Sequence, residues 1–234
     1  MTPYDASWDA QTIDLVLGEF IDTQHKWLRH LGPDSDSLIQ AARDSVSGGK
    51  RFRAAFCWWG HLAIDAPLDP QALARACASL ELLHASALVH DDYMDASDTR
   101  RGRPSAHRAF EKLHRANGWS ASAEQYGASA AILLGDLLLS WADELLRTSG
   151  LPSDRILRAL RYFDLTRSEV VLGQFLDISA QARGANDVDT AMKVVRYKSA
   201  KYSIERPLHV GAALAGGSDE SIEQLTRFGL PLGE

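Results

Sequence analysis

The sequence predicts an all-α fold, and three observations support this prediction. Apolar residues recur at the three- and four-residue spacing of an amphipathic helix in segment after segment, whereas the period-two alternation of half-buried strands is scarcely seen. Stretches rich in glycine, proline and aspartate separate these segments. With 234 residues, 45% of them hydrophobic and 24% charged, the chain suits a soluble globular unit with a sizeable core. We therefore expect one bundle of about eight helices.

The order of the helices follows from the breakers, which lie at 31–37, 47–49, 65–70, 101–105, 149–154 and 182–189. Helical spacing is clearest in an early segment, with Ile13, Val16, Leu17, Phe20 and Ile21, and in a later one, with Leu73, Ala76, Leu80, Leu83 and Ala87. Several loops hold a residue able to cap the next helix: Ser37, Asp69, Ser153 and Asp187.

Charge and cysteine content argue against several classes of protein. The formal net charge of -6 argues against nucleic-acid binding and against binding to an anionic membrane surface, because both need a basic excess. Cys57 and Cys77 have neither metal-ligand nor CxxC spacing, which argues against a disulfide framework or structural zinc. The N-terminus lacks a signal-peptide pattern, and acidic residues interrupt the apolar stretch 129–146 short of the roughly 20 residues that a bilayer span needs. We expect a cytoplasmic protein without stable membrane insertion.

Acidic residues at the end of one expected helix form the first candidate site. In ELLHASALVHDDYMDASDTRRGRPSAH, residues 81–107, His84, Leu88, Asp91 and Asp95 share one helical stripe, and Asp92 lies on its flank. Carboxylates are unfavourable at a helix C-terminus and repel each other, so this arrangement needs a compensating cation. Mg²⁺ suits closely spaced carboxylates and is usually completed by substrate phosphates. The pattern therefore predicts a Mg²⁺ and phosphate site.

Two basic stretches could supply the phosphate ligands. Arg100 and Arg101 follow the aspartates directly and offer the planar fork that grips phosphate oxygens. In SGGKRFR, residues 47–53, paired glycines precede Lys50 and Arg53, and exposed amides beside cationic side chains form an anion site, although the Walker spacing is absent. The alternative is a solvated acidic helix end with basic loops that face water.

Polar residues on two later apolar helices add to this inventory. Gln174 and Asp177 interrupt the apolar pattern of TRSEVVLGQFLDIS, and the alternative is that they lie at the margin of the helix. Lys198 and Ser199 stand among small and apolar neighbours in VVRYKSAKYSIERPLHVGAALAGG. A buried lysine needs a partner, and phosphate would serve, whereas the alternative is a lysine that snorkels to the surface.

These stretches together resemble the trans-isoprenyl diphosphate synthases, also called polyprenyl synthetases, and most resemble geranylgeranyl diphosphate synthases. GGKRFR is similar to the family's GGKRxRP, the aspartate block with its trailing RRG to the first aspartate-rich motif, GQFLD to GQxxD and YKSA to the Lys-Thr motif. Ala54 stands where proline is usual, and Ser199 replaces threonine. The second aspartate-rich motif of the family follows a segment like FGLPLGE, at which this chain stops, so we expect residues 1–234 to lack that motif and the C-terminal helices.

The resemblance implies a single-domain bundle of the isoprenoid synthase type with a central cavity. It also implies a Mg²⁺-dependent, head-to-tail condensation of isopentenyl diphosphate with an allylic diphosphate. By resemblance, Asp91, Asp95 and Asp177 would hold Mg²⁺, and the catalytic group would be Asp91, Asp92, Asp95, Arg100 and Lys198. Arg100, Lys198, Ser199 and Gln174 would bind the allylic diphosphate or lie near its C1, and isopentenyl diphosphate would meet Lys50, Arg53, His84 and Arg101.

Product length is expected to depend on side chains one turn before the aspartates. Ala87 and Ser86 are small and would leave the path of the growing hydrocarbon open, whereas the resemblance implies that aromatic rings there close it early, as in farnesyl-forming members of the family. We therefore expect geranylgeranyl diphosphate, with longer products if nothing deeper, such as Leu83, closes the floor. The chain lacks a Ser/His/Asp or Cys/His arrangement, which fits a reaction that needs no protein nucleophile.

Other interpretations remain open. A class I terpene cyclase also uses an aspartate-rich helix in an all-α fold, but it does not need the second diphosphate site that Lys50, Arg53, His84 and Arg101 would form. A polyprenyl diphosphate synthase with a longer or shorter product would share all of these residues. A non-catalytic subunit of a synthase would bind metal and diphosphate without turnover. The resemblance further implies a homodimer.

Overall fold

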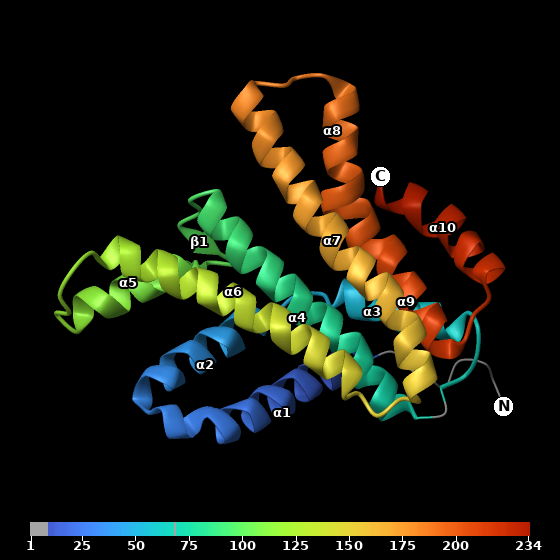
Figure 1. Cartoon of the computed structure of the whole chain (residues 1–234), viewed down its shortest axis with the longest axis horizontal. Coiled ribbons are helices and arrows are strands. Elements are labelled where there is room, and N and C mark those ends of the chain that lie inside the picture. The colour runs from blue at the N-terminus through green and yellow to red at the C-terminus, as the bar shows by residue number, and fades with distance from the viewer. Residues whose placement is uncertain (1–8, 68) are drawn as a thin grey trace. The chain divides into compact units, whose positions relative to one another are not determined.

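The computed structural model describes residues 9–67 and 69–234, and most of them are helical (Figure 1). The elements in chain order are α1 (Ala10–Leu28), the 3₁₀ turn η1 (Arg29–Leu31), α2 (Pro33–Val46), α3 (Phe52–Leu62), α4 (Pro70–Met94), β1 (Thr99–Arg100), β2 (Arg103–Pro104), α5 (Ala106–Ala116), α6 (Ala123–Arg147), α7 (Ser153–Arg183), α8 (Val188–Val194), the π-helix η2 (Val195–Glu205), α9 (Arg206–Ala215) and α10 (Asp219–Gly233). The all-α prediction is confirmed.

Two of the four predicted helix caps are confirmed and two are wrong. The side chain of Asp69 accepts the backbone N–H of Ala72, and that of Asp187 accepts the N–H of Thr190. Ser37 lies inside α2 because that helix begins earlier, with Pro33 in its first turn after Gly32. Ser153 is already the first residue of α7, since the extended Pro152 takes the capping place.

The described chain falls into two compact units. Unit 1 contains the described residues through Ile13, Lys50–Leu80 and Leu145–Glu234, and unit 2 contains Asp14–Gly49 and Glu81–Glu144. The single domain and the central cavity therefore stay predictions.

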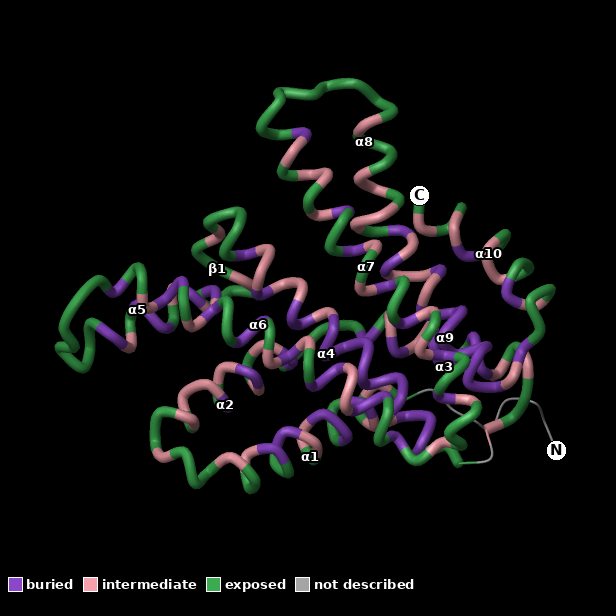
Figure 2. Tube along the Cα trace, viewed as in Figure 1, coloured by how far each residue is buried: buried purple, intermediate pink, exposed green. Residues whose placement is uncertain are grey.

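Each unit has its own apolar core, seen as the buried stretches of the tube in Figure 2. In unit 2 the fully buried side chains include Leu17, Ile21, Leu82, Leu83, Leu134 and Leu138. In unit 1 they include Leu73, Leu80, Leu146, Phe163 and His209. Removal of this apolar surface from water drives the packing of the helices. These cores support the helices that carry most of the candidate site residues of each unit.

One described helix, α4, is long and apolar enough to cross a membrane by length and composition alone. In this fold 78% of its apolar stretch is buried inside the protein, as in the core helix of a soluble protein. The pattern therefore indicates no membrane span.

Candidate active site

The aspartate block lies at the C-terminal end of α4, in unit 2. Asp91 and Asp92 belong to the last turn of the helix, and the backbone N–H of Asp95 still donates to the carbonyl of Asp91 at 2.8 Å. Asp95 is exposed, Asp91 is half-buried and Asp92 is only 3% exposed. His84, on the predicted stripe, is half-buried. The three carboxylates therefore differ in how far water and a ligand can reach them.

A small hairpin after α4 turns the chain back toward the aspartates. β1 pairs antiparallel with β2, with Thr99 opposite Pro104 and Arg100 opposite Arg103. The two connecting residues, Arg101 and Gly102, have φ values of 52° and 75°. Positive φ at both positions is typical of the type I′ turn that suits two-residue hairpins. The sequence predicted only a loop here, although Arg-Gly at the turn was the available signal.

Arg100 is the compensating cation that the aspartates require. Its Nε donates to both carboxylate oxygens of Asp92, at 3.0 and 3.1 Å, and its Nη2 makes a further short bond to Oδ1. The same Nη2 lies 3.7 Å from Oδ2 of Asp91. The hydrogen bonds with Asp92 raise the pKa of Arg100. Such a forked pair neutralises the charge of Asp92. The accessible acids of the block are therefore Asp91 and Asp95.

The donor set of the block fits Mg²⁺. Asp91 and Asp95 are hard oxygen donors one helical turn apart, and Mg²⁺ is usually bound through one or two carboxylates together with substrate phosphates. Across residues 9–67 and 69–234, no three or more His, Cys, Asp or Glu side chains are already grouped as a metal site. The arrangement therefore suits an ion completed by a phosphate ligand rather than one enclosed by protein groups.

Arg101 contacts the glycine stretch that the sequence singled out. Its Nη1 donates to the carbonyls of Ser47 and Gly48, at 2.7 and 2.8 Å, and all three residues belong to unit 2. Arg101 itself is exposed. The structure thus joins two stretches 54 residues apart in sequence, and a role of Arg101 in substrate binding stays a prediction.

The remaining residues of the glycine stretch belong to unit 1. Lys50 is exposed, with its Nζ 5.6 Å from the centre of the Phe52 ring. Arg53 donates from Nη2 to Oγ of Ser203 at 2.7 Å, and its guanidinium lies 4.2 Å from the centre of the Tyr202 ring. Its Nε is buried, with no hydrogen-bond acceptor within the described part of the chain. Arg53 is therefore held against η2, and Lys50 is not.

The GQFLD and YKSA stretches meet within unit 1, on α7 and η2. Nζ of Lys198 lies 2.6 Å from Oδ2 of Asp177. An added Cβ on Gly173 would lie 2.6 Å from the backbone nitrogen of Lys198, so only glycine allows the two helices to approach this closely. The predicted partner of Lys198 was phosphate, and the structure supplies a carboxylate.

Sequence reasoning missed two features of this contact. Gly173 had no predicted role, although a glycine inside an apolar helix is a signal of close packing. The π-helix carrying Lys198 and Ser199 had no local signal; π-helices are rare and occur often at functional sites. Ser199 is exposed, and Nε2 of Gln174 is buried without a hydrogen-bond partner among the described residues.

The predicted chain-length residues lie on α4, before the aspartates. Leu83 and Ser86 are buried, and Ala87 is half-buried. Ala87 lies four residues before Asp91, hence on nearly the same helical face. Their influence on product length stays a prediction.

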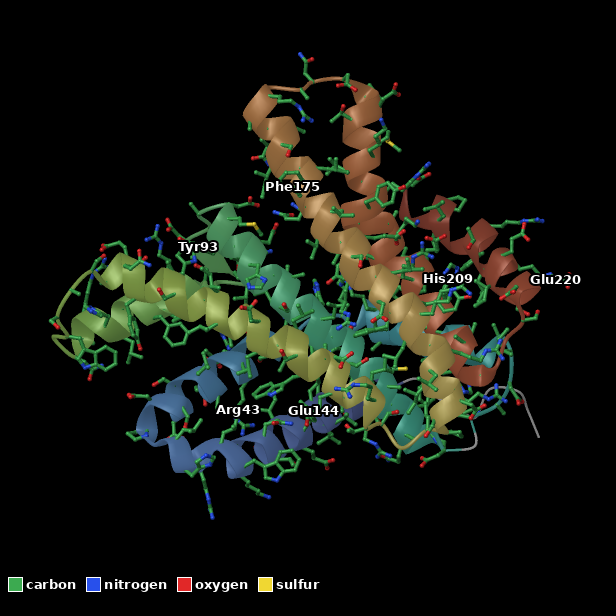
Figure 3. The ribbon with its side chains drawn as sticks, viewed as in Figure 1. Arg43, Tyr93, Glu144, Phe175, His209 and Glu220 are labelled. Carbon is green, nitrogen blue, oxygen red and sulfur yellow. The ribbon has the colours of Figure 1, made fainter. Side chains whose placement is uncertain are left out.

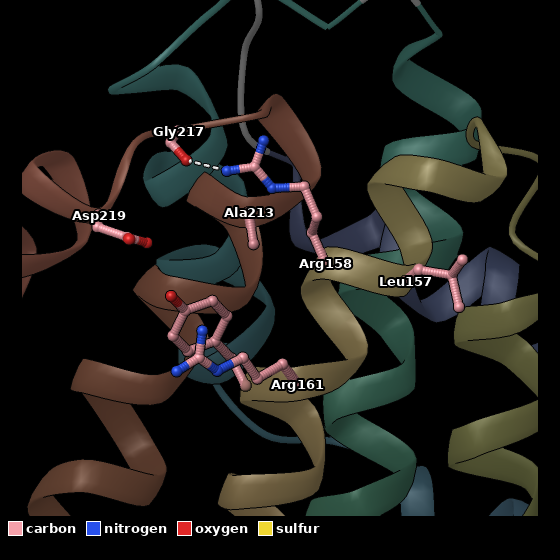
Figure 4. A pocket seen from close by; sticks show the side chains of 7 residues that line it. Leu157, Arg158, Arg161, Ala213, Gly217 and Asp219 are labelled. Atoms are coloured by element: carbon pink, nitrogen blue, oxygen red, sulfur yellow. Dashed lines mark hydrogen bonds between the residues drawn. The ribbon is translucent and has the colours of Figure 1, made fainter.

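A cavity of about 250 Å³ in unit 1 contains none of the predicted site residues (Figure 4). It is lined by Leu157, Arg158, Arg161, Tyr162, Ala213, Gly217 and Asp219. Arg158 donates from Nη2 to the carbonyl of Gly217 at 2.7 Å, which ties α7 to the turn before α10. We therefore do not count this cavity as part of the candidate active site.

The chain is similar in sequence to known prenyl diphosphate synthases. A geranylgeranyl diphosphate synthase from Methanosarcina mazei is 32% identical over 200 residues, which cover 85% of this chain and 56% of the relative. A nonaprenyl diphosphate synthase from Mycobacterium tuberculosis is 31% identical over 199 residues, which cover 83% of this chain and 50% of the relative. The chain thus spans about half the length of these curated relatives.

The same likeness holds for solved structures and for the family pattern. The crystal structure of a geranylgeranyl pyrophosphate synthase from Corynebacterium glutamicum, complexed with isoprenyl diphosphate and magnesium, superposes with a TM-score of 0.92 and 38% identity. The match covers 95% of this chain and 64% of that one. The family model for polyprenyl synthetase matches residues 35–234. The chain therefore belongs to the polyprenyl synthetase family.

Proposed function

We propose that the chain acts as a trans-prenyltransferase that joins isopentenyl diphosphate head to tail with an allylic diphosphate. The aspartate block carries the proposal, because Asp91 and Asp95 stay accessible while Arg100 neutralises Asp92. A diphosphate has the charge and the geometry to bind a metal held by such acids together with forked or ammonium cations. Membership of the polyprenyl synthetase family supports the same reaction class.

Mg²⁺ is the expected cofactor, held by Asp91 and Asp95, with Asp177 reaching a further ion. Bound there, it would stabilise negative charge on the departing diphosphate. The protein contributes the cations. Lys198 would exchange Asp177 for the allylic diphosphate, and Arg100 would reach the same group from its exposed edge. The exchange at Lys198 would replace an internal ion pair with a substrate contact.

The other predicted residues would orient the reacting carbons. Ser199 and Gln174 would lie near the allylic C1, and the buried Nε2 of Gln174 is a donor that a ligand could satisfy. Isopentenyl diphosphate would bind Lys50, Arg53, His84 and Arg101. Ionisation breaks the allylic C–O bond, the isopentenyl double bond attacks the resulting carbocation, and a proton is then lost to the departing diphosphate. An apolar, water-poor surrounding protects the cation from hydrolysis.

The proposed product is geranylgeranyl diphosphate, because Ser86 and Ala87 are small. Known relatives are named for products that range from geranylgeranyl to nonaprenyl diphosphate, so product length calls for a direct measurement. We further propose a cytoplasmic homodimer, on the family resemblance.

Product analysis by mass spectrometry tests this function. The purified protein is incubated with Mg²⁺, isopentenyl diphosphate and, separately, dimethylallyl, geranyl or farnesyl diphosphate, with an Asp91→Ala variant as control. A twenty-carbon diphosphate absent from the control supports the proposal. A product without diphosphate would identify a terpene cyclase. Diphosphate binding without elongation from any primer would mean either that turnover needs residues after 234 or that the chain is a non-catalytic subunit.

A further inference from the structure

Helix α7 runs antiparallel to η2 and α9, and ionic contacts lie on both sides of a close contact between them. The two helical stretches lie side by side in Figure 1. Gly173 marks the close approach, and the pair of Asp177 with Lys198 lies on one side of it. Glu169, one turn before Gly173 on α7, makes the contacts on the other side. The helix that presents Lys198 is therefore held at two places along α7.

Glu169 uses both of its carboxylate oxygens. Oε1 accepts from Nζ of Lys201 at 2.6 Å and from Nη2 of Arg206 at 2.8 Å, and Oε2 accepts from Nε of Arg206 at 2.7 Å. The contact with Arg206 is thus a forked pair, which fixes orientation as well as distance. Nη1 of Arg206 continues the network to Nδ1 of His209, 3.0 Å away, and Nε2 of His209 bonds to Oγ1 of Thr226 at 2.9 Å (His209 is labelled in Figure 3).

The cluster is largely shielded from water and balanced in charge. The side chains of Glu169, Lys201 and Arg206 are 16%, 15% and 11% exposed. Glu205 supplies the second acid, with Oε2 3.9 Å from Nζ of Lys201 and 3.9 Å from Nη1 of Arg206. Burial raises the pKa of Glu169, but hydrogen bonds from Arg206 and Lys201 outweigh burial and leave the pKa below its usual range. Removal of Glu169 would leave two largely shielded cations with one acid, which is unfavourable.

The position of the cluster along the chain links it to Lys198. Lys201 and Glu205 belong to the π-helix η2, and Arg206 is the first residue of α9. Glu169 thus forms ion pairs with the segment in which the π-helix η2 ends and the α-helix α9 begins. A π-helix has an unusual i→i+5 hydrogen-bond register and is rare, so we expect contacts from neighbouring helices to help maintain it. Lys198 precedes Lys201 by three residues in the same π-helix.

We propose that Glu169 is a positioning residue that anchors the C-terminal half of η2 and so sets the place from which Lys198 binds diphosphate. The inference rests on the proposed function, because it takes diphosphate as the ligand of Lys198. Glu169 does not touch that ligand itself; it acts through the helix that both lysines share.

A double-mutant cycle tests this role. Binding of inorganic diphosphate with Mg²⁺ is measured by calorimetry for the wild type, Glu169→Gln, Lys198→Met and the double variant. Glu223→Gln is the matched control, since Glu223 also pairs with an arginine, Arg227, at 2.6 Å but is 64% exposed. We expect Glu169→Gln to weaken binding about tenfold and Glu223→Gln to leave it unchanged. Once Lys198 is replaced, Glu169→Gln should have no further effect.

Hydrogen exchange followed by mass spectrometry adds a readout without ligand. Glu169→Gln should accelerate amide exchange in residues 195–205, whereas Glu223→Gln should not. If Glu169→Gln fails to fold, as judged by circular dichroism, Glu169→Asp keeps the charge with a shorter reach and should show the same pattern with a smaller effect.

The outcomes separate the two proposals. Equal weakening by Glu169→Gln with and without Lys198 would mean a general loss of stability and would overturn the positioning role, as would unchanged binding. A wild-type protein that does not bind diphosphate would overturn the proposed function. In that case the exchange of residues 195–205 still decides whether Glu169 anchors η2.

Discussion

Arg100 pairs with the buried Asp92, and this pairing separates the tasks of the three aspartates. Asp92 is 3% exposed and paired with the guanidinium of Arg100, so we predict that its main contribution is to hold the hairpin against α4. Asp95 is exposed and Asp91 half-buried, so a metal ion can reach both. Although these aspartates lie within four positions of one another, we therefore expect their replacement to affect different properties, turnover in one case and stability in the other.

Replacement of Asp95 and Asp92 should separate catalysis from stability. Asp95→Ala should lower turnover by orders of magnitude while the free energy of unfolding changes by less than about 0.5 kcal/mol, because the side chain is exposed. Asp92→Asn should lower the free energy of unfolding by about 1–3 kcal/mol, a value reduced by the partial exposure of Arg100. Urea unfolding and steady-state kinetics on both variants check this. Equal destabilisation by the two would contradict the division of tasks.

At the scale of elements, one helix in each unit presents candidate site residues. α4 presents the acids at its end and small side chains one turn earlier, and α7 presents the acid and the glycine that receive the π-helix. In both cases the spacing of four residues places the relevant side chains on one face. Substitutions on these faces should therefore change the reaction and not only the stability.

A large side chain at the start of this face of α4 should shorten the product. Ala87→Phe places a ring about one turn below Asp91, where the growing hydrocarbon is proposed to run. We expect shorter diphosphates by mass spectrometry with turnover retained, and an unchanged product for Ala87→Ser. The same product length in Ala87→Phe would rule out this path for the hydrocarbon.

A methyl group at Gly173 should disturb the contact between α7 and η2. Its Cβ would lie 2.6 Å from the nitrogen of Lys198, so Gly173→Ala should cost about 1–3 kcal/mol of unfolding free energy and weaken diphosphate binding. The control is Gly18→Ala in α1, where nothing in the described structure lies within 4 Å of the added carbon. That change should stabilise by roughly 0.5–1 kcal/mol, because alanine favours the helix. Urea unfolding compares the two, and a neutral Gly173→Ala would contradict the close packing.

At the scale of the whole molecule, the buried polar cluster makes stability depend on pH. Burial and the neighbouring Arg206 and Lys201 lower the pKa of His209 to about 3, and Glu169 opposes them only in part. The unfolded histidine, with an ordinary pKa near 6.5, therefore binds a proton between about pH 6.5 and pH 3 while the folded one does not. Stability from this group is complete above about pH 6.5 and is lost as the pH falls toward 3.

The pH prediction is measurable by urea unfolding at about pH 7.5 and about pH 5. His209 should account for a loss of about 2 kcal/mol between these values, and His209→Asn should show a correspondingly smaller loss. Burial also lowers the pKa of His61 and of His107, so the comparison of the two proteins is needed to isolate His209. Identical pH dependence in wild type and variant would contradict the lowered pKa.

The sequence by itself determined the all-α fold, the stripe that carries Asp91 and Asp95, and the family motifs, because helical periodicity and motif spacing are local properties. Only the tertiary structure decided the partners: Asp92 for Arg100, Asp177 for Lys198, and Glu169 for Lys201. The two residues are 21 positions apart in the pair of Lys198 with Asp177 and 32 positions apart in the pair of Lys201 with Glu169. Such pairs depend on which helices pack together and in what register. No local signal in the sequence marked the π-helix η2, which packs against α7.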